Sequence, residues 1–147
     1  MSKIAPRTDK PPKQSAAEQK RLIKKLDTAL SKIIRERDGG KPCIELCGET
    51  HYVWQAGHFR PRGMMMTRFH PKNVNRQQSN CNYYKSRKND VIRHRLGIDL
   101  RWGAGTADEL YDLSVKYKNW SCDELRTLIE AAKKGIEEYT KVYESLP

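Results

Sequence analysis

A chain of 147 residues is long enough for one compact domain with a hydrophobic core. Hydrophobic residues make up 37% of it and charged residues 32%, and no apolar run approaches the ~20 residues that a membrane span requires, so we expect a cytoplasmic protein that does not bind membranes. The formal net charge is +11, and between residues 50 and 101 there are 11 Lys or Arg residues against two acids, Asp90 and Asp99, which favours nucleic acid as the partner.

The first element predicted along the chain is an amphipathic helix over residues 15–38. Residues 1–14 contain three prolines and several basic residues but almost nothing apolar, so we expect a disordered basic arm. Ser15 and Glu18 have the spacing of a capping box that begins the helix. Asp38 and the two glycines after it are expected to end the helix. Apolar residues between these ends recur at three- and four-residue steps, which predicts a face that packs on a core: Leu22, Ile23, Leu26, Leu30, Ile33 and Ile34.

The middle of the chain predicts a β-hairpin followed by helices. The segment CIELCG, residues 43–48, has the character of a metal-binding turn, and residues 51–59 alternate as a strand would. Residues 73–78 are expected to form the returning strand. Ser79 can cap a helix that runs through the segment NCNYYKSRK, and residues 90–96 are expected to form another helical piece that ends at Gly97.

Two further capping boxes are predicted in the C-terminal part, over residues 106–109 and 121–124. One long helix is expected after the second box, with a stripe that packs on the first helix: Leu125, Leu128, Ile129, Ala132, Ile136, Tyr139 and Tyr143. The predicted fold class is therefore α+β and mostly helical. A ββα core over residues 43–96 is framed by amphipathic helices over residues 15–38 and 106–144, within a single domain of residues 15–147.

The string AGHFRPRG…RFHPKNVNRQQSNCNYYKS, which begins at Ala56, resembles the phage NinG/Rap recombination endonucleases, a group of HNH (His-Me finger) nucleases. The resemblance implies a ββα-metal unit with a histidine on one strand, an asparagine in the loop or second strand, and a metal ligand on the helix. By this resemblance His58 is the general base, Asn73 holds the histidine-bearing loop in place, and Asn82 is a ligand of catalytic Mg²⁺ or Mn²⁺. Neutral imidazole can deprotonate water, and an amide oxygen is a hard metal ligand, so the residue types suit phosphodiester hydrolysis.

The catalytic metal site departs from the family pattern at one position. The family commonly has an acidic or histidine ligand just before the base histidine, where this chain has Gly57. Helical spacing leaves Ser86 and Asp90 as candidates for the second protein ligand.

A structural Zn²⁺ is expected on Cys43, Cys47 and Cys81, with small buried thiols as the alternative. Tetra-cysteine relatives have another cysteine at the position that Gln78 occupies here. Three residues remain as candidates for a fourth ligand: His51, His70 and Cys122. Otherwise His51, His70 and His94 are expected to be surface histidines or hydrogen-bonded core residues.

The implied function is a metal-dependent endonuclease that cuts branched recombination intermediates such as Holliday junctions and D-loops, encoded by a phage or prophage and acting in the bacterial host. Two alternatives stay open: an HNH nuclease of restriction or mobile-element type acting on duplex DNA, and a DNA-binding module without catalysis. A homodimer is also compatible with the sequence. Five basic residues that flank the predicted site are expected to contact phosphates: Arg60, Arg62, Lys85, Arg87 and Lys88.

Overall fold

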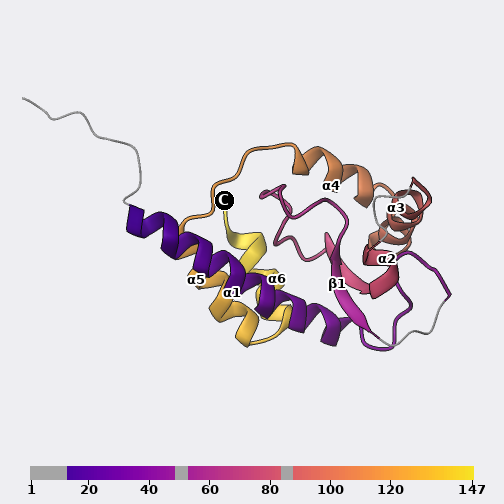
Figure 1. The fold of residues 1–147 in the computed structure, drawn as a ribbon, viewed down its shortest axis with the longest axis horizontal. Helices are drawn as coiled ribbons and strands as arrows, with labels where there is room; N and C mark the ends of the chain where they lie inside the picture. Colours follow the sequence, from indigo (N-terminus) through magenta and orange to yellow (C-terminus); the bar gives the residue numbers. More distant parts are fainter. Residues whose placement is uncertain (1–12, 49–52, 84–87) are drawn as a thin grey trace, which may run out of the picture.

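The computed structural model describes residues 13–48, 53–83 and 88–147. In chain order the elements are α1 (Lys13–Arg37), β1 (Trp54–His58), β2 (Val74–Gln78), α2 (Ser79–Tyr83), α3 (Lys88–Trp102), α4 (Thr106–Ser114), α5 (Cys122–Lys133) and α6 (Ile136–Ser145). Helices α1, α5 and α6 lie together on one side, and the hairpin lies beside α2, α3 and α4 on the other (Figure 1). The mostly helical α+β class is confirmed. Within the described ranges, no helix combines the length and the apolar character needed to cross a bilayer.

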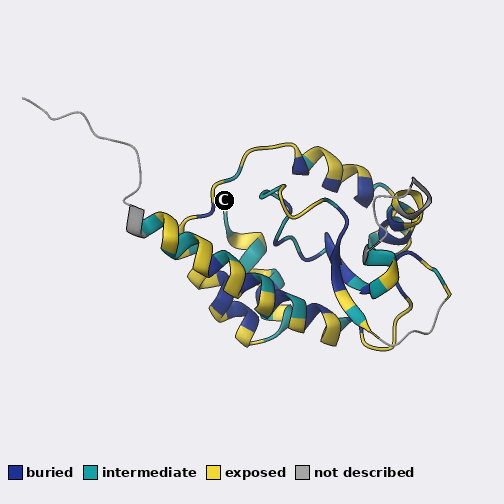
Figure 2. Cartoon of the chain, in the orientation of Figure 1, coloured by how far each residue is buried: buried dark blue, intermediate teal, exposed yellow. Residues whose placement is uncertain are grey.

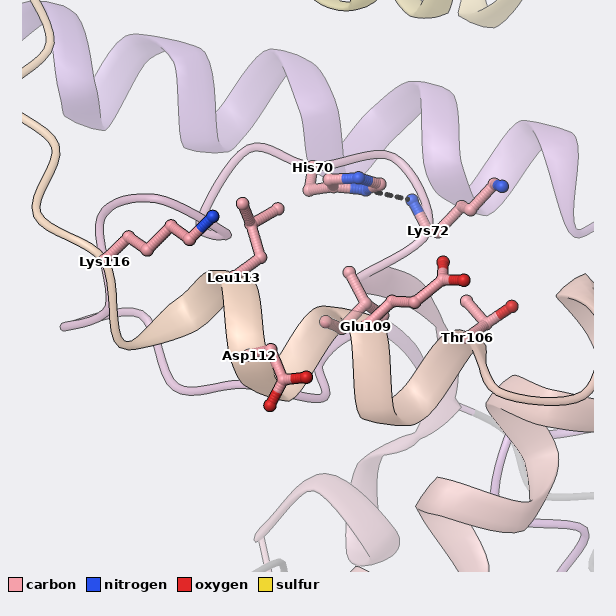
Figure 3. Close-up of a pocket in the computed structure, with 8 residues that line it drawn as sticks. His70, Lys72, Thr106, Glu109, Asp112, Leu113 and Lys116 are labelled. Atoms are coloured by element: carbon pink, nitrogen blue, oxygen red, sulfur yellow. Dashed lines mark hydrogen bonds between the residues drawn. The ribbon is translucent and has the colours of Figure 1, made fainter.

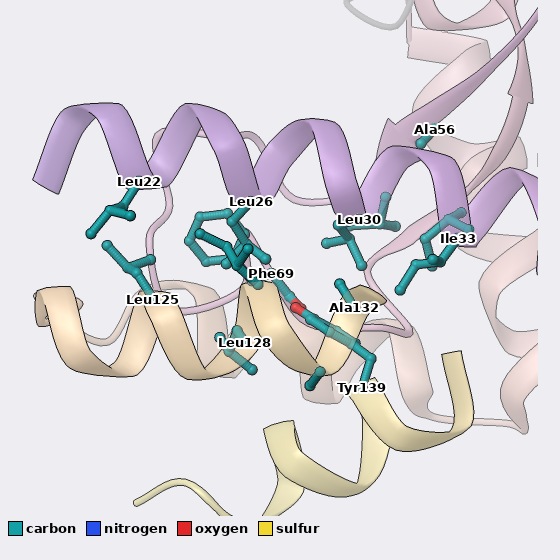
Figure 4. Close-up of a cluster of buried hydrophobic side chains, with 14 of the residues drawn as sticks. Leu22, Leu26, Leu30, Ile33, Ala56, Phe69, Leu125, Leu128, Ala132 and Tyr139 are labelled. Atoms are coloured by element: carbon teal, nitrogen blue, oxygen red, sulfur yellow. The ribbon is translucent and has the colours of Figure 1, made fainter. Parts of the chain in front are cut away.

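The larger apolar core lies between α1, α5 and α6 (Figure 4). The apolar stripe predicted on α1 is buried except for Ile23, which is half-buried, and Figure 2 shows the opposite side of the helix exposed to solvent. Leu26 of α1 and Leu125 of α5 are both 0% exposed, so the predicted packing of the C-terminal stripe on the first helix is confirmed. Tyr139 of α6 is equally buried, and its hydroxyl donates to the carbonyl oxygen of Phe69 at 2.6 Å. This bond ties the helical layer to the loop that joins the two strands.

The hairpin is a two-stranded antiparallel sheet in which Gly57 pairs with Asn75. Side chains alternate between the two faces of a strand, so Ala56 and Val74 share one face, and both are buried in the core that α1 contributes to. The opposite face includes Gln55 and contacts α2. Both strands therefore lie between helices, with a different helix on each face.

Helix α3 does not end at Gly97, as the sequence predicted, but continues to Trp102 and stops before Gly103, which has a φ of 114°. The reason for a glycine at position 97 is a close approach of backbones. A Cβ atom built on Gly97 would collide with the carbonyl oxygen of Ile44, well inside the 3.0 Å that real Cβ atoms respect. Gly97 thus lets α3 pack directly on the turn after Cys43 instead of terminating the helix.

One of the three predicted capping boxes is present. Ser121 accepts from the Glu124 amide, and Glu124 accepts from the Ser121 amide in return. The box at Ser15 is wrong, because α1 begins two residues earlier, at Lys13. Residues 1–12 of the predicted arm lie outside the described residues, and the last two residues of that arm are helical.

The box at Thr106 is also wrong, because the residue that precedes α4 is Gly105, with a φ of 90°. A carboxylate from another helix takes the role instead, since Asp99 of α3 accepts from the Ala107 amide at 2.8 Å. The long C-terminal helix is likewise interrupted at Gly135, whose φ of 106° separates α5 from α6. A left-handed residue lets the chain reverse, and α6 can then fold back onto the core.

We expect Gly97→Ala to lower the free energy of unfolding by about 2 kcal/mol or more, because the new methyl group would meet backbone that cannot move without shifting α3. At an unconstrained helical site the same change would stabilise by about 0.5–1 kcal/mol. Urea unfolding measures the difference. Gly63→Ala is the control, since nothing lies within 4 Å of its Cβ position. Equal stability of the two variants would contradict the close-packing explanation.

Candidate functional site

His58 is the last residue of β1 and is 8% exposed. Its Nε2 lies 2.9 Å from the carbonyl oxygen of Arg68 in the loop between the strands. A carbonyl can only accept, so Nε2 carries the proton in this bond and Nδ1 is the basic nitrogen of the neutral ring. Strand alternation directs the Cβ of His58 to the face that packs toward α1.

Asn73 lies immediately before β2 and is 0% exposed. Its side chain closes on the backbone that follows His58: Oδ1 accepts from the Arg60 amide at 2.8 Å, and Nδ2 donates to the Arg60 carbonyl at 3.1 Å. Nδ2 also donates to the Thr67 carbonyl at 3.0 Å. These are the contacts that a residue holding the histidine-bearing loop needs, although the catalytic role itself stays a prediction.

Asn82 lies on α2, and its Nδ2 donates to Oε1 of Gln55 at 2.8 Å. Helix α2 begins directly after β2 because the Gln78 side chain accepts from the amides of Asn80 and Cys81 and so satisfies its first turn. Asn82 therefore lies on the Gln55 face of the hairpin, whereas the His58 side chain starts from the opposite face. The structure brings both residues to one hairpin but not to one face.

Gly57, where a ligand is missing from the family pattern, has Gln77 beside it. A Cβ on Gly57 would collide with Oε1 of Gln77. Gln77 is 0% exposed, and within the described part of the chain neither of its amide atoms has a hydrogen-bond partner. A buried amide in that state costs about 1–3 kcal/mol, so a bound ligand would relieve it. The two residues that the sequence offered as a second protein ligand of the catalytic metal are not placed: Ser86 and the Asp90 side chain lie outside the described residues.

The three cysteines predicted to hold zinc come together. The sulfur atoms of Cys43, Cys47 and Cys81 lie within 4.8 Å of one another. Tetrahedral zinc with Zn–S bonds of about 2.3 Å separates two sulfurs by about 3.8 Å, so a small contraction would fit the ion. Burial, followed by the neighbouring sulfurs, raises the pKa of Cys81 above its ordinary value, and a dication there would favour the thiolate instead.

The residues proposed from the sequence as a fourth ligand lie elsewhere. Cys122 is on α5, with its sulfur 3.9 Å from the Ser15 carbonyl. His70 lines a pocket against α4, where its Nδ1 accepts from the Lys72 amide (Figure 3). Burial, with a smaller effect of Lys72, lowers the pKa of His70 to about 4 and keeps it neutral. Gln78 uses its side-chain oxygen at the start of α2, and His51 lies outside the described residues.

The basic residues predicted to contact DNA are in different situations. Arg62 is exposed. The guanidinium of Arg60 donates to the Ser114 hydroxyl at 2.9 Å and lies 4.3 Å from the centre of the Tyr111 ring, so it packs on α4. Lys85 and Arg87 lie outside the described residues, as does the side chain of Lys88.

The sequence analysis assigned α1 to core packing and missed the basic character of its other side. Five of its exposed basic residues line one shallow surface groove: Arg21, Lys24, Lys25, Lys32 and Arg35. The signal was present in the sequence, because these residues recur with helical spacing opposite the apolar stripe.

Comparisons with known proteins agree on one family. The family model "Bacteriophage Lambda NinG protein" matches residues 2–143. The chain is 31% identical over 107 residues to Protein ninG of Escherichia phage 933W, which covers 72% of this chain and 52% of that protein. Protein ninG of Escherichia phage lambda is 30% identical over 107 residues, covering 72% and 51%. The chain thus spans about half the length of these relatives. No solved structure matches.

We expect the native protein to contain near-stoichiometric zinc, and a chelator to lower its melting temperature by about 5 °C or more, equivalent to about 2 kcal/mol, because bound metal contributes to folding. Cys81→Ser should abolish zinc retention. Cys122→Ser is the matched control, since its sulfur lies outside the cluster. Elemental analysis and thermal melts measure both quantities. Zinc-free protein of unchanged stability would favour simple buried thiols.

Proposed function

The chain belongs to the NinG family of bacteriophage proteins, and from this premise we propose that it is a metal-dependent endonuclease that cuts branched DNA. The observation that carries the proposal is the set of hydrogen bonds from Asn73 to the backbone after His58. They hold a histidine at the end of a strand, directly before a loop, in the order of a ββα-metal unit. The nuclease mechanism, the branched substrate and DNA as the partner are all parts of this proposal.

In this mechanism His58 activates the attacking water. The Nε2–H bond to the Arg68 carbonyl fixes the tautomer, so Nδ1 is the nitrogen that accepts the proton. Asn73 acts through position: its side chain holds both backbone groups of Arg60, and it thereby limits the motion of the strand end that carries His58. Loss of such restraint lowers the fraction of time that the base spends in a productive orientation.

The donor set on the Gln55 face is compatible with a hard dication. Asn82 and Gln77 would hold it through amide oxygens, since Gln77 is buried beside Gly57 and its amide has no partner among the described residues. When bound, Mg²⁺ or Mn²⁺ supplies charge that offsets the phosphate and the leaving oxygen. The protein offers neutral oxygens here, so the phosphates of the DNA would supply the negative ligands.

The charge distribution supports DNA as the substrate. Arg62 is exposed in the loop after His58, and five exposed basic residues of α1 line the surface groove described above. Surfaces of this kind bind phosphates without reading base sequence. A branched junction presents several duplex arms at one place and would engage more than one basic surface at once. The preference for branches rests on the family resemblance.

A DNA-binding protein without catalysis is the second candidate, and three observations favour it. His58 is 8% exposed with one nitrogen bonded to a carbonyl, and Gly57 removes a ligand that the family pattern usually has. The His58 side chain also starts from the hairpin face opposite the one that Asn82 contacts. A nuclease of restriction or mobile-element type remains the other alternative, distinguished by equal cleavage of linear duplex.

We expect purified protein with Mg²⁺ or Mn²⁺ to cut a four-way junction faster than an equal-length duplex, and His58→Ala to reduce the rate by about 10²–10⁴-fold with nearly unchanged binding. His70→Gln is the matched histidine control and should retain activity. Thermal melts confirm that each variant folds. Normal cleavage by His58→Ala would exclude His58 as the base. Binding without cleavage by the wild type would favour the non-catalytic protein.

We expect Arg62→Ala to weaken binding of all DNA substrates, and to make the log–log salt slope less negative by about 0.9 if it neutralises one phosphate. Arg60→Ala should instead act mainly on stability, because that guanidinium is bonded to Ser114 and stacked on Tyr111. Fluorescence anisotropy over a salt series, beside urea unfolding, separates the two effects. The reverse pattern would show that Arg60 leaves α4 to bind phosphate.

A further inference from the structure

Over residues 13–48, 53–83 and 88–147, the cysteine cluster groups three of the four ligands of a closed tetrahedral zinc site. Structural zinc takes four protein ligands, and Cys43, Cys47 and Cys81 supply three. Among the described residues, the same turn offers a carboxylate, Glu45, which contributes to the raised pKa of the Cys81 thiol after burial and the neighbouring sulfurs and so lies near that thiol. Glu45 is 1% exposed, although glutamate is rarely buried in proteins.

We propose that Glu45 is the fourth ligand of a zinc site formed with Cys43, Cys47 and Cys81, and that His94 positions its carboxylate. This inference is separate from the proposed nuclease activity, because it concerns a structural metal and is tested without DNA.

The turn itself directs Glu45 inward. The Leu46 amide donates to the Cys43 carbonyl at 2.8 Å, and Leu46 has a left-handed φ of 55°, which is uncommon for a residue with a branched side chain. Leu46 is 44% exposed, whereas Ile44 and Glu45 on its N-terminal side are buried. The reversal at Leu46 thus places the apolar side chain in solvent and the carboxylate beside the sulfurs.

Backbone amides also point at the cluster. The Gln78 amide donates to the Cys43 sulfur at 3.4 Å. Burial raises the pKa of the Cys43 thiol, whereas the Gln78 and Glu45 amides act to lower it. Amide donors favour a thiolate over a thiol, as a metal ligand requires. The same turn therefore supplies two ligand side chains, Cys43 and Glu45, and an amide that supports one of them.

His94 contacts the Glu45 carboxylate, as expected of a residue that orients a metal ligand. Its Nδ1 is 3.7 Å from Oε1 of Glu45, and the His94 side chain is 0% exposed. The ring lies against Phe59, with centroids 5.3 Å apart. His94 and Gly97 are three residues apart on α3 and so share a helix face. The close contact of Gly97 with Ile44 is therefore what brings His94 to Glu45.

The charges in this region are consistent with a bound dication. Three thiolates gathered in a buried place are costly unless a cation compensates their charge. Zinc with three thiolates and one carboxylate is still anionic, and Arg101 on α3 lies close enough to Cys43 for the two to interact electrostatically. Arg101 also donates to the Pro42 carbonyl at 3.0 Å, so its position beside the turn is fixed.

The test is metal retention by the full chain. We expect Glu45→Ala to weaken zinc binding by about 100-fold or more in competition with a chromophoric chelator. His94→Phe should cost less, about 10–100-fold, as expected for a residue that acts through a ligand. Glu130→Ala is the matched control, because Glu130 is exposed and pairs with Lys133 at 2.7 Å. It should bind zinc as the wild type does.

Glu45→Cys keeps the proposal testable even if Glu45→Ala folds poorly. A cysteine there should restore tight zinc binding, and Co²⁺-loaded protein should gain thiolate charge-transfer absorption relative to the wild type. An unchanged Co²⁺ spectrum in Glu45→Cys, or wild-type zinc affinity in Glu45→Ala, would overturn the assignment of Glu45. A larger loss in His94→Phe than in Glu45→Ala would instead make His94 the ligand. Zinc affinity is measured without DNA, so failure of the Glu45 assignment would leave the nuclease proposal untouched, and failure of the nuclease proposal would leave this one untouched.

Discussion

A buried carboxylate at the end of α1 connects the helical layer to the hairpin and α3. Asp38 is 0% exposed and accepts from the Arg37 guanidinium at 2.7 and 2.9 Å, from the Arg76 amide of β2 at 2.9 Å, and from the Arg101 guanidinium of α3 at 3.4 Å. Burial raises the pKa of Asp38, but the bonds to Arg37 and Arg76 and the charge of Arg101 outweigh it and hold the pKa below its usual value. Removing one member would leave charges buried without compensation, which is why the network acts as a unit.

Both candidate sites depend on this network. Arg37 also donates to the carbonyls of Pro71 and Val74, which flank Asn73, so the residue that holds the His58 loop is itself held from α1. Arg101 reaches from Asp38 to the Pro42 carbonyl and so fixes the chain just before the cysteine turn. The positions of the proposed base and of the proposed zinc ligands are thus set by one group of buried charges and not by two local motifs.

The two sites are also joined through α2. Cys81 and Asn82 are adjacent in this short helix, which follows β2 without a linker because Gln78 satisfies its first turn. A metal held by Cys43, Cys47 and Cys81 would anchor α2 to the turn before β1, and with it the side chain that contacts Gln55. A five-residue helix has little stability of its own. A structural metal is a physical means of giving Asn82, the proposed ligand of the catalytic metal, a defined position on this helix.

The sequence by itself determined the helices that carry apolar stripes, the two strands of the hairpin and the Ser121 cap, because periodicity and short spacing are properties of neighbouring residues. The family resemblance, and not local spacing, grouped Cys81 with Cys43 and Cys47. It also pointed to the family through His58, Asn73 and Asn82. Only the tertiary structure decided the roles of Asp38 and Gly97, which the sequence indicated as helix ends, and only it showed that Glu45 is buried beside His94. All three contact residues that lie more than thirty positions away in the chain, namely Arg76, Ile44 and His94. A buried polar group or a close backbone contact affects stability only once these distant segments have come together.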